Sequence, residues 1–212
     1  MNSFDPVLYW KQRYHSGGNS GAGSYGRLAN YKTDFINAFT HTNNVLEILD
    51  LGCGDGRIMQ RLGVPRYIGV DVSETALGLC RAASLNDPSR RFYLWSERPL
   101  HQQAVMTLSM DVIYHLTEDR GFAEYMEALF GAASRFVVIY ASNADAAWSS
   151  PHVRHRRFTD HVQRAFPDWR LAAHCPNPYP FRPDQPDETS FADFFIFTRS
   201  GAACTVPIPP YD

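Results

Sequence analysis

The sequence predicts an α/β fold in which a seven-stranded sheet, parallel except for its last strand, carries helices on both faces. From residue 45 onwards, short apolar runs alternate with helix-like segments, which is the pattern of a parallel sheet covered by helices. The last two runs are joined by a link with five prolines and no helical pattern, which suits an antiparallel final strand. The 212 residues, 44% of them hydrophobic, suffice for one domain with a sizeable core.

The expected strands and helices follow one another along the chain. The strands share a short apolar run bounded by turn residues, and they are residues 45–51, 66–71, 90–95, 104–110, 135–140, 169–175 and 191–199. Helices are expected over residues 56–62, 73–84 and 117–133. Ser73 is placed as the N-terminal cap of the second helix, and Thr117 as the cap of the third, where it precedes a turn of acidic residues.

Residues 1–44 differ in pattern from the rest and are expected to form an N-terminal cap or lid on the same domain. They run from the aromatic and charged VLYWKQRY through the glycine-rich HSGGNSGAGSYGR to a helical segment at residues 27–39. Residues 45–200 are then the core. Residues 201–212 end in the proline-rich TVPIPPYD and are expected to be a flexible tail.

Charge and cysteine content narrow the classes of function. A net charge of −2, from 20 basic and 22 acidic residues, gives no global field that would gather nucleic acid or an anionic membrane. The four cysteines lie far apart without CxxC spacing, which argues against a zinc site or a redox dithiol. The first residues lack the basic and apolar regions of a secretion signal, and no apolar run reaches membrane-spanning length, so we expect a cytoplasmic protein.

The two glycine-rich stretches differ in their surroundings. HSGGNSGAGSYGR follows YWKQRYH, which is not a buried strand, so this stretch is expected to be a mobile lid or linker, or a loop that closes on substrate. ILDLGCGDGR joins a buried strand to a helix-like segment, and Gly52, Gly54 and Gly56 let a ligand approach the backbone. The next strand, RYIGVD, ends in Asp71, whose carboxylate can accept hydrogen bonds from both hydroxyls of a ribose.

Together, ILDLGCGDGR, IGVDVSETAL and SMDVIYHL resemble the class I S-adenosylmethionine-dependent methyltransferases, over about residues 45–199. The resemblance implies a Rossmann-like sheet of strand order 3-2-1-4-5-7-6 and S-adenosylmethionine as the cofactor. It also implies that the glycine loop holds the methionine portion, that the acid ending the second strand holds the ribose, and that residues after the third strand meet the adenine. The residues implied are Asp50, Gly52, Gly54, Gly56, Asp71, Trp95, Ser96 and Glu97.

A nicotinamide-dinucleotide enzyme would share the logic of the first glycine loop. It is disfavoured by the form DLGCGDG and by Arg57, which stands where G-x-G-x-x-G needs its third glycine. The adenine segment departs from the commoner family pattern, because its acid, Glu97, follows LWS.

The pattern YW..RY followed by a glycine-serine segment is similar to the lid region of some bacterial methyltransferases, in which an N-terminal element folds over the cofactor. The resemblance implies that Tyr9, Trp10, Arg13 and Tyr14 close the site, with Arg13 near the cofactor carboxylate. The alternative is that these aromatic side chains simply pack on the sheet.

Methyl transfer is an in-line displacement, so the protein must align the acceptor, remove the proton of a hydroxyl and exclude water. Ligands of open α/β sheets bind at the carboxyl ends of the strands, where Asp111 and His115 follow the fourth strand. An imidazole of ordinary pKa near ~6.5 suits a general base at neutral pH. A structural role for His115 is the alternative.

The segment HVRHRRF, which follows the fifth strand, supplies further candidates. His152 or His155 is an alternative base. Arg154, Arg156 and Arg157 are candidates for binding a carboxylate or phosphate of the acceptor. The alternative for this basic cluster is a solvated surface.

The predicted function is S-adenosylmethionine-dependent O-methylation of a small-molecule or glycan hydroxyl, with histidine or aspartate as general base. No metal is expected, because Asp111, Asn143 and Asp145 lack the adjacent acid–amide pair of magnesium-dependent O-methyltransferases. A peptide acceptor is one alternative, and a nucleic acid is a less favoured one, since the chain is net acidic. A further alternative is a cofactor-binding partner protein without catalysis.

Overall fold

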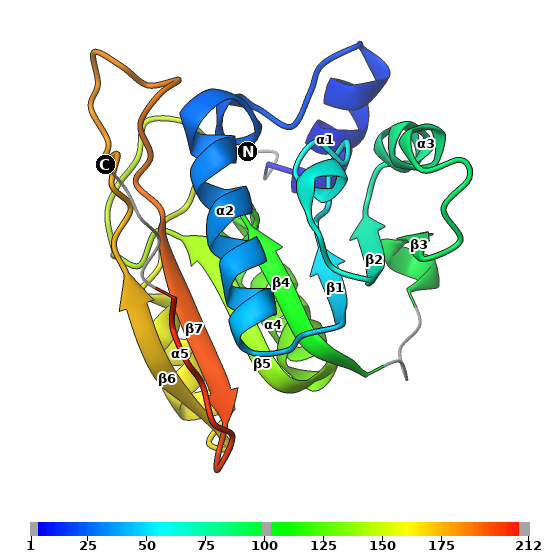
Figure 1. Ribbon diagram of the computed structural model, residues 1–212. Coiled ribbons are helices and arrows are strands. Elements are labelled where there is room, and N and C mark those ends of the chain that lie inside the picture. The colour runs from blue at the N-terminus through cyan, green and yellow to red at the C-terminus, as the bar shows by residue number, and fades with distance from the viewer. Residues whose placement is uncertain (1–3, 99–102, 208–212) are drawn as a thin grey trace.

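The computed structural model describes residues 4–98 and 103–207, which fold around a seven-stranded sheet flanked by helices (Figure 1). The strands are β1 Glu47–Leu51, β2 Arg66–Asp71, β3 Arg90–Leu94, β4 Ala104–Met110, β5 Ala133–Ala141, β6 Trp169–Cys175 and β7 Asp193–Arg199. Their order is β3-β2-β1-β4-β5-β7-β6, and β7 pairs antiparallel with both β5 and β6. The predicted strand order and the antiparallel final strand are confirmed.

The helices cover both faces of this sheet. They are α1 Pro6–His15, α2 Gly26–Thr42, α3 Glu74–Ala83, α4 Asp119–Gly131 and α5 Phe158–Ala165. α2 packs on one face, while α4 and α5 pack on the other (Figure 1). α1 lies beyond the carboxyl ends of β1 and β2 (Figure 1), so the N-terminal segment covers the edge at which a parallel sheet binds ligands.

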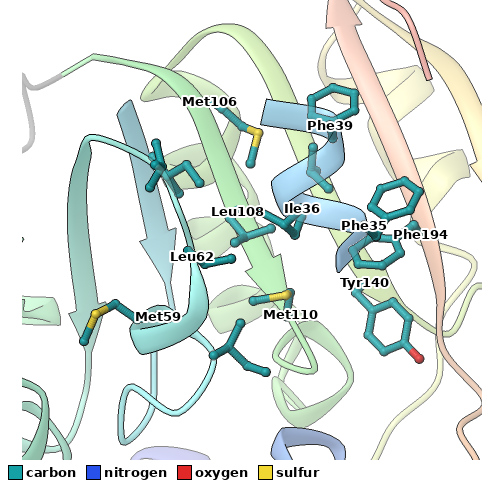
Figure 2. Packing of buried hydrophobic residues seen from close by; sticks show 14 of the residues in the cluster. Phe35, Ile36, Phe39, Met59, Leu62, Met106, Leu108, Met110, Tyr140 and Phe194 are labelled. Atoms are coloured by element: carbon teal, nitrogen blue, oxygen red, sulfur yellow. The ribbon is translucent and has the colours of Figure 1, made fainter. Parts of the chain in front are cut away.

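Alternation along the strands divides the buried residues into two cores. On β7, Phe194 faces α2, whereas Phe195 faces the side of α4 and α5. The core beneath α2 is rich in aromatic residues. The rings of Phe35 and Phe194 stack with centroids 4.1 Å apart (Figure 2), and Phe39 meets Phe136 edge to face at 5.2 Å. The apolar face of α2 therefore anchors the N-terminal segment, up to Thr42, to the sheet.

The helix predicted over residues 56–62 is wrong, because only a short 3-10 turn forms there, Met59–Arg61. Backbone groups that a longer helix would use are bound by a side chain of α2 instead. Asn37 donates through Nδ2 to the carbonyl of Arg61 at 2.9 Å and accepts from the amide of Gly63 at 2.8 Å. Too few residues remain for a cooperative helix between the glycine loop and this anchor.

The cap predicted at Thr117 is also wrong, whereas the cap at Ser73 is confirmed. Ser73 accepts from the amide of Ala76 at 3.3 Å. α4 begins only at Asp119, with Glu118 in the capping position and no side-chain cap. The carbonyl of Thr117 accepts from two arginines of the segment after β5, so this stretch is held by tertiary contacts instead of capping the helix.

The described part of the C-terminal segment, residues 201–207, is hydrogen-bonded to the end of α2. The side chain of Asn43 donates to the carbonyl of Thr205 at 2.7 Å and accepts from the amide of Thr205 at 3.0 Å. Residues 208–212 of the predicted tail lie outside the described residues. In the part of the chain that the structure describes, no helix is both long and apolar enough to span a bilayer.

Replacing Phe194 with alanine is expected to lower the free energy of unfolding by about 3–5 kcal/mol, because a fully buried, stacked ring would leave a cavity. Leu85→Ala is the control: Leu85 is 81% exposed, and its truncation should change stability by less than about 0.5 kcal/mol. Urea unfolding of both variants measures the difference. Equal midpoints for the two would contradict this account of the core.

Candidate active site

A cavity of about 260 Å³ lies where β1, β2 and β4 end, and α1 forms one of its walls. Parallel pairing places these carboxyl ends side by side: Asp50 pairs with Gly69 of β2 on one side and with Leu108 of β4 on the other. Seven of the predicted cofactor-binding and catalytic residues line the cavity: Asp50, Gly52, Gly54, Asp71, Trp95, Asp111 and His115. The fold thus gathers residues that are far apart in the sequence.

The glycine loop approaches its neighbours so closely that two of its positions leave no room for a side chain. Gly52 has φ +88° and Gly54 has φ +58°, a region that favours glycine. A Cβ at Gly54 would overlap the hydroxyl oxygen of Ser20, and one at Gly52 would overlap the side chain of Val112. The space beside these two α-carbons is therefore filled by Ser20 and Val112, while Gly52 and Gly54 themselves line the cavity.

Asp71 ends β2 and holds the glycine loop. It is 8% exposed, and its two carboxylate oxygens accept from the amides of Gly54 at 3.0 Å and Ser73 at 2.9 Å. Burial raises the pKa of Asp71, while these two amides lower it. The carboxylate keeps further lone pairs for a ligand in the cavity.

Asp50, at the end of β1, has one satisfied oxygen and one that is not. The hydroxyl of Tyr67 donates to Oδ2 at 2.6 Å, while Oδ1 is buried and has no hydrogen-bond partner among the described residues. Burial raises the pKa of Asp50 to about 7. A carboxyl of this kind binds either a proton or a cationic donor.

The predicted adenine segment forms a 3-10 turn, Trp95–Glu97, after β3. The Trp95 ring stacks on Tyr125 with centroids 5.5 Å apart, and the Arg98 guanidinium lies 4.0 Å from its centre. Ser96 and Glu97 are exposed and lie outside the lining of the cavity. Trp95 is therefore the member of this segment that can contact a ligand held there.

Asp111 forms an ion pair that the sequence analysis missed. Lys32, in the middle of α2, is 1% exposed, and its Nζ lies 2.5 Å from Asp111 Oδ2. The hydroxyl of Tyr114 donates to the other carboxylate oxygen at 2.8 Å. One signal could have indicated Lys32: it occupies the apolar stripe of its helix, four residues after Leu28 and before Ile36.

His115 lines the cavity and is held in one tautomer. Its Nδ1 donates to the carbonyl of His152 at 2.8 Å, because a carbonyl can only accept, which leaves Nε2 as an acceptor. Burial lowers the pKa of His115 to about 4, so the ring is neutral at pH 7. His152 is stacked between Tyr9 and His115, with centroids 5.1 and 5.5 Å away.

His155 faces a different cavity, of about 510 Å³, beside β6 and α5. It is 7% exposed and shares a 2.6 Å hydrogen bond with the hydroxyl of Ser142. The ring of Tyr114 lies between this histidine and Asp111, 6.3 Å from His155 and bonded through its hydroxyl to Asp111. The structure therefore brings His115 and Asp111 together, but not His155.

The three predicted substrate arginines lie outside the lining of the first cavity. Arg154 and Arg156 both pair with Asp119, at 2.9 and 3.2 Å, and donate to carbonyls of the segment before α4. They tie the segment after β5 to that stretch. Arg157 is exposed, and its amide donates to Asp145 at 3.0 Å. Acceptor binding by these arginines stays a prediction.

The predicted lid is fastened to the glycine loop by Ser20. Its amide donates to Asp55 Oδ2, and its hydroxyl accepts from the amide of Asp55, both at 3.1 Å. Tyr14 shares a 2.8 Å hydrogen bond with the same hydroxyl. Arg13 points elsewhere: its Nε donates to the carbonyl of Asn19 at 2.7 Å, and it lies outside the cavity lining, so its contact with a cofactor stays a prediction.

The three oxygen donors considered for a metal do not meet. Asp111 pairs with Lys32, Asn143 bonds to Thr159, and Asp145 accepts from the amide of Arg157. They line three different cavities. Within residues 4–98 and 103–207, no group of three or more His, Cys, Asp or Glu side chains is arranged to hold a metal ion.

The chain matches no protein-family model and no curated protein, but it is similar to solved methyltransferase structures. Magnesium protoporphyrin IX methyltransferase (ChlM) from Synechocystis PCC 6803, with bound SAH, superposes with a TM-score of 0.67 at 15% identity, over 92% of this chain and 100% of that one. The N-methyltransferase NodS from Bradyrhizobium japonicum WM9, in complex with S-adenosyl-L-homocysteine, gives 0.68 at 11% identity, over 93% and 100%. The CcbJ methyltransferase from Streptomyces caelestis gives 0.60 at 14% identity, over 94% and 100%. The chain therefore has the class I methyltransferase fold.

Gly54→Ala is expected to lower the free energy of unfolding by roughly 1–3 kcal/mol, because the new Cβ meets the hydroxyl of Ser20 and a positive φ disfavours alanine. Gly78→Ala is the matched control: no atom lies within 4 Å of a Cβ there, and alanine favours the α3 helix by up to about 1 kcal/mol. Chemical unfolding and amide exchange at Ser20 measure both effects. A Gly54→Ala protein that keeps full stability and a protected Ser20 amide would contradict the close approach.

Asp50→Asn is expected to gain stability over the wild type as pH rises. Because burial raises the pKa of Asp50 from 3.8 to about 7, the folded protein holds this proton more tightly than the unfolded chain, and the wild type loses stability between those pH values. The advantage of the variant should grow by about 4 kcal/mol from pH 4 to pH 8. Urea unfolding across this range measures it, and a constant difference would refute the assignment.

Asp87→Asn is expected to show the opposite pH dependence of stability, relative to the wild type, in the same urea-unfolding experiment. Hydrogen bonds from Ser89 lower the pKa of the exposed Asp87, so its ionised form stabilises the folded state at neutral pH and that contribution is lost as pH falls. The Asp87→Asn protein should therefore be less stable than the wild type at pH 7 and approach it at low pH.

Proposed function

We propose that the chain is an S-adenosylmethionine-dependent methyltransferase that binds its methyl donor in the cavity at the ends of β1, β2 and β4, here called the donor pocket. One observation carries the proposal: Asp71, Gly54 and Asp50 line the same pocket within a class I methyltransferase fold. Gly54 leaves no room for a side chain, and Oδ1 of Asp50 has no hydrogen-bond partner among the described residues. The similar ChlM and NodS structures hold S-adenosyl-L-homocysteine, which supports the same ligand class here.

The polar groups of the donor pocket fit such a cofactor. Asp71 would accept hydrogen bonds from the ribose hydroxyls, and the loop at Gly52 and Gly54 would lie against the methionine portion. The buried Oδ1 of Asp50, which lacks a partner among the described residues, would accept from the ammonium group. Trp95, which lines the pocket between the contacts it makes with Tyr125 and Arg98, would contact the adenine.

When bound, the cofactor supplies an electrophilic methyl group on a sulfonium centre. The work of the protein is then to align the acceptor and to exclude water. Trp10, together with Pro6 and Val7 of α1, gives the pocket an apolar wall. Ser20 bonds this N-terminal segment to Asp55 of the glycine loop, and Tyr14 bonds to the same Ser20 hydroxyl, so the wall lies over the loop that would hold the cofactor.

The proposed acceptor is a hydroxyl of a small molecule or glycan, whose proton passes to His115 or Asp111. His115 is neutral at pH 7 and its Nε2 can accept a proton, but its pKa of about 4 makes it a weak base. Asp111 is already paired with Lys32. Weak bases favour an acidic, phenol-like hydroxyl over the aliphatic hydroxyl of a glycan, because the latter holds its proton far more tightly.

The proposal is tested by titrating the protein with S-adenosylmethionine and S-adenosyl-L-homocysteine in a calorimeter. Micromolar binding, about 8 kcal/mol, is expected for the wild type. Asp71→Ala should weaken it roughly 10- to 100-fold, because charge-assisted hydrogen bonds to the ribose are lost. Asp87→Ala removes an exposed carboxylate elsewhere and should bind as the wild type does. Absence of wild-type binding, or equal affinity in Asp71→Ala, would overturn the proposal.

A further inference from the structure

The ion pair of Lys32 and Asp111 places a buried charge in the wall of the cavity, which costs stability. Lys32 is 1% exposed, although a buried lysine costs several kcal/mol unless its charge is compensated. Asp111 compensates it at 2.5 Å, in a backbone conformation with φ +58° that only a few non-glycine residues adopt. A methionine and an asparagine could fill the same volume without any charge.

The surroundings hold this pair rigidly at the edge of the donor pocket. The hydroxyl of Tyr114 donates to Asp111 Oδ1 at 2.8 Å, and the Tyr140 ring lies 5.3 Å from Lys32 Nζ. A Cβ at Gly23 would lie 2.9 Å from Asp111 Oδ2, so the N-terminal segment packs directly against the carboxylate. Both members of the pair line the pocket nevertheless.

A charge that enters so small a pocket must interact with this pair. Lys32 and Asp111 both line this cavity of about 260 Å³. At an effective dielectric constant of about 20, two unit charges roughly 10 Å apart still change a dissociation constant by a factor of about ten. In the wild type, Lys32 and Asp111 carry opposite charges and largely cancel.

We propose that Lys32 is a positioning residue that holds the Asp111 carboxylate and cancels its charge, and that this balanced pair sets how strongly the donor pocket prefers the cationic sulfonium of the methyl donor over the neutral thioether of the product. The inference rests on the proposed function, because it concerns the ligands of the same pocket. A bare carboxylate would retain the donor too tightly, and a bare ammonium would repel it. The neutral pair itself adds little net charge to the pocket, which Asp50 and Asp71 also line.

Three variants test the charge balance with calorimetry, using S-adenosylmethionine and S-adenosyl-L-homocysteine as ligands. The measured quantity is the ratio of the dissociation constant of the product to that of the donor. Lys32→Met leaves the Asp111 carboxylate without its compensating charge and should raise this ratio roughly tenfold. Asp111→Asn leaves the Lys32 ammonium uncompensated and should lower the ratio roughly tenfold. Both replacements keep the volume, and asparagine tolerates a positive φ. The double variant should return to within about threefold of the wild type.

Lys11→Met is the matched control, because it removes an exposed lysine of α1 that does not line the pocket. Its ratio should equal that of the wild type. If Asp111→Asn does not fold, Lys32→Met and the double variant still decide the question.

The outcomes separate this inference from the function on which it rests. Opposite shifts of the ratio in the two single variants support it, since a merely structural defect weakens both ligands together. Binding of both ligands by the wild type, with an unchanged ratio in Lys32→Met, overturns the charge-balance inference alone. Binding of neither ligand by the wild type overturns the proposed function and this inference with it.

Discussion

The absence of a side chain at Gly54 allows three separate segments of the chain to meet at one point. The amide of Gly54 donates to Asp71 at the end of β2. The hydroxyls of Ser20 and Tyr14, from the N-terminal segment, occupy the space that a Cβ at Gly54 would need. A methyl group at this position would separate the N-terminal segment from the glycine loop. The enclosure of the donor pocket and the position of α1 both depend on this close approach.

The pocket concentrates charge that the rest of the fold must stabilise. Asp50 and Asp71 are both buried with raised pKa values, and Lys32 is buried in the same pocket, where it pairs with the partly exposed Asp111. Buried charges of this kind rarely add to stability. The compensation comes from the aromatic core beneath α2, which fixes the helix that carries Lys32 against β4, β5 and β7. The same helix therefore supplies both the anchor and a charge of the pocket.

The sheet could be predicted from the sequence because its strands are continuous apolar runs, and the strand order followed from the family resemblance. The residues of the donor pocket could be predicted where they stand at strand ends, as Asp50, Asp71 and Asp111 do. Lys32 escaped because it lies in a helix far from any motif, and its role depends on a contact across 79 positions of the chain. The prediction of a short helix after the glycine loop was wrong for a related reason. A single side chain of α2, Asn37, binds the backbone there, and no local sequence pattern indicates that contact.

The aromatic side chains of α1 pack on the histidines beside the pocket. The Trp10 ring meets His115 edge to face at 5.1 Å, and Tyr9 stacks on His152 at 5.1 Å. His152 in turn holds Nδ1 of His115 through its carbonyl. α1 cannot move away from the pocket without removing two of the rings that pack against these histidines, which would admit water and change the burial that keeps the pKa of His115 low. Burial is the largest cause of the lowered pKa of His115, and Trp10 of α1 supplies one of the rings that pack on it.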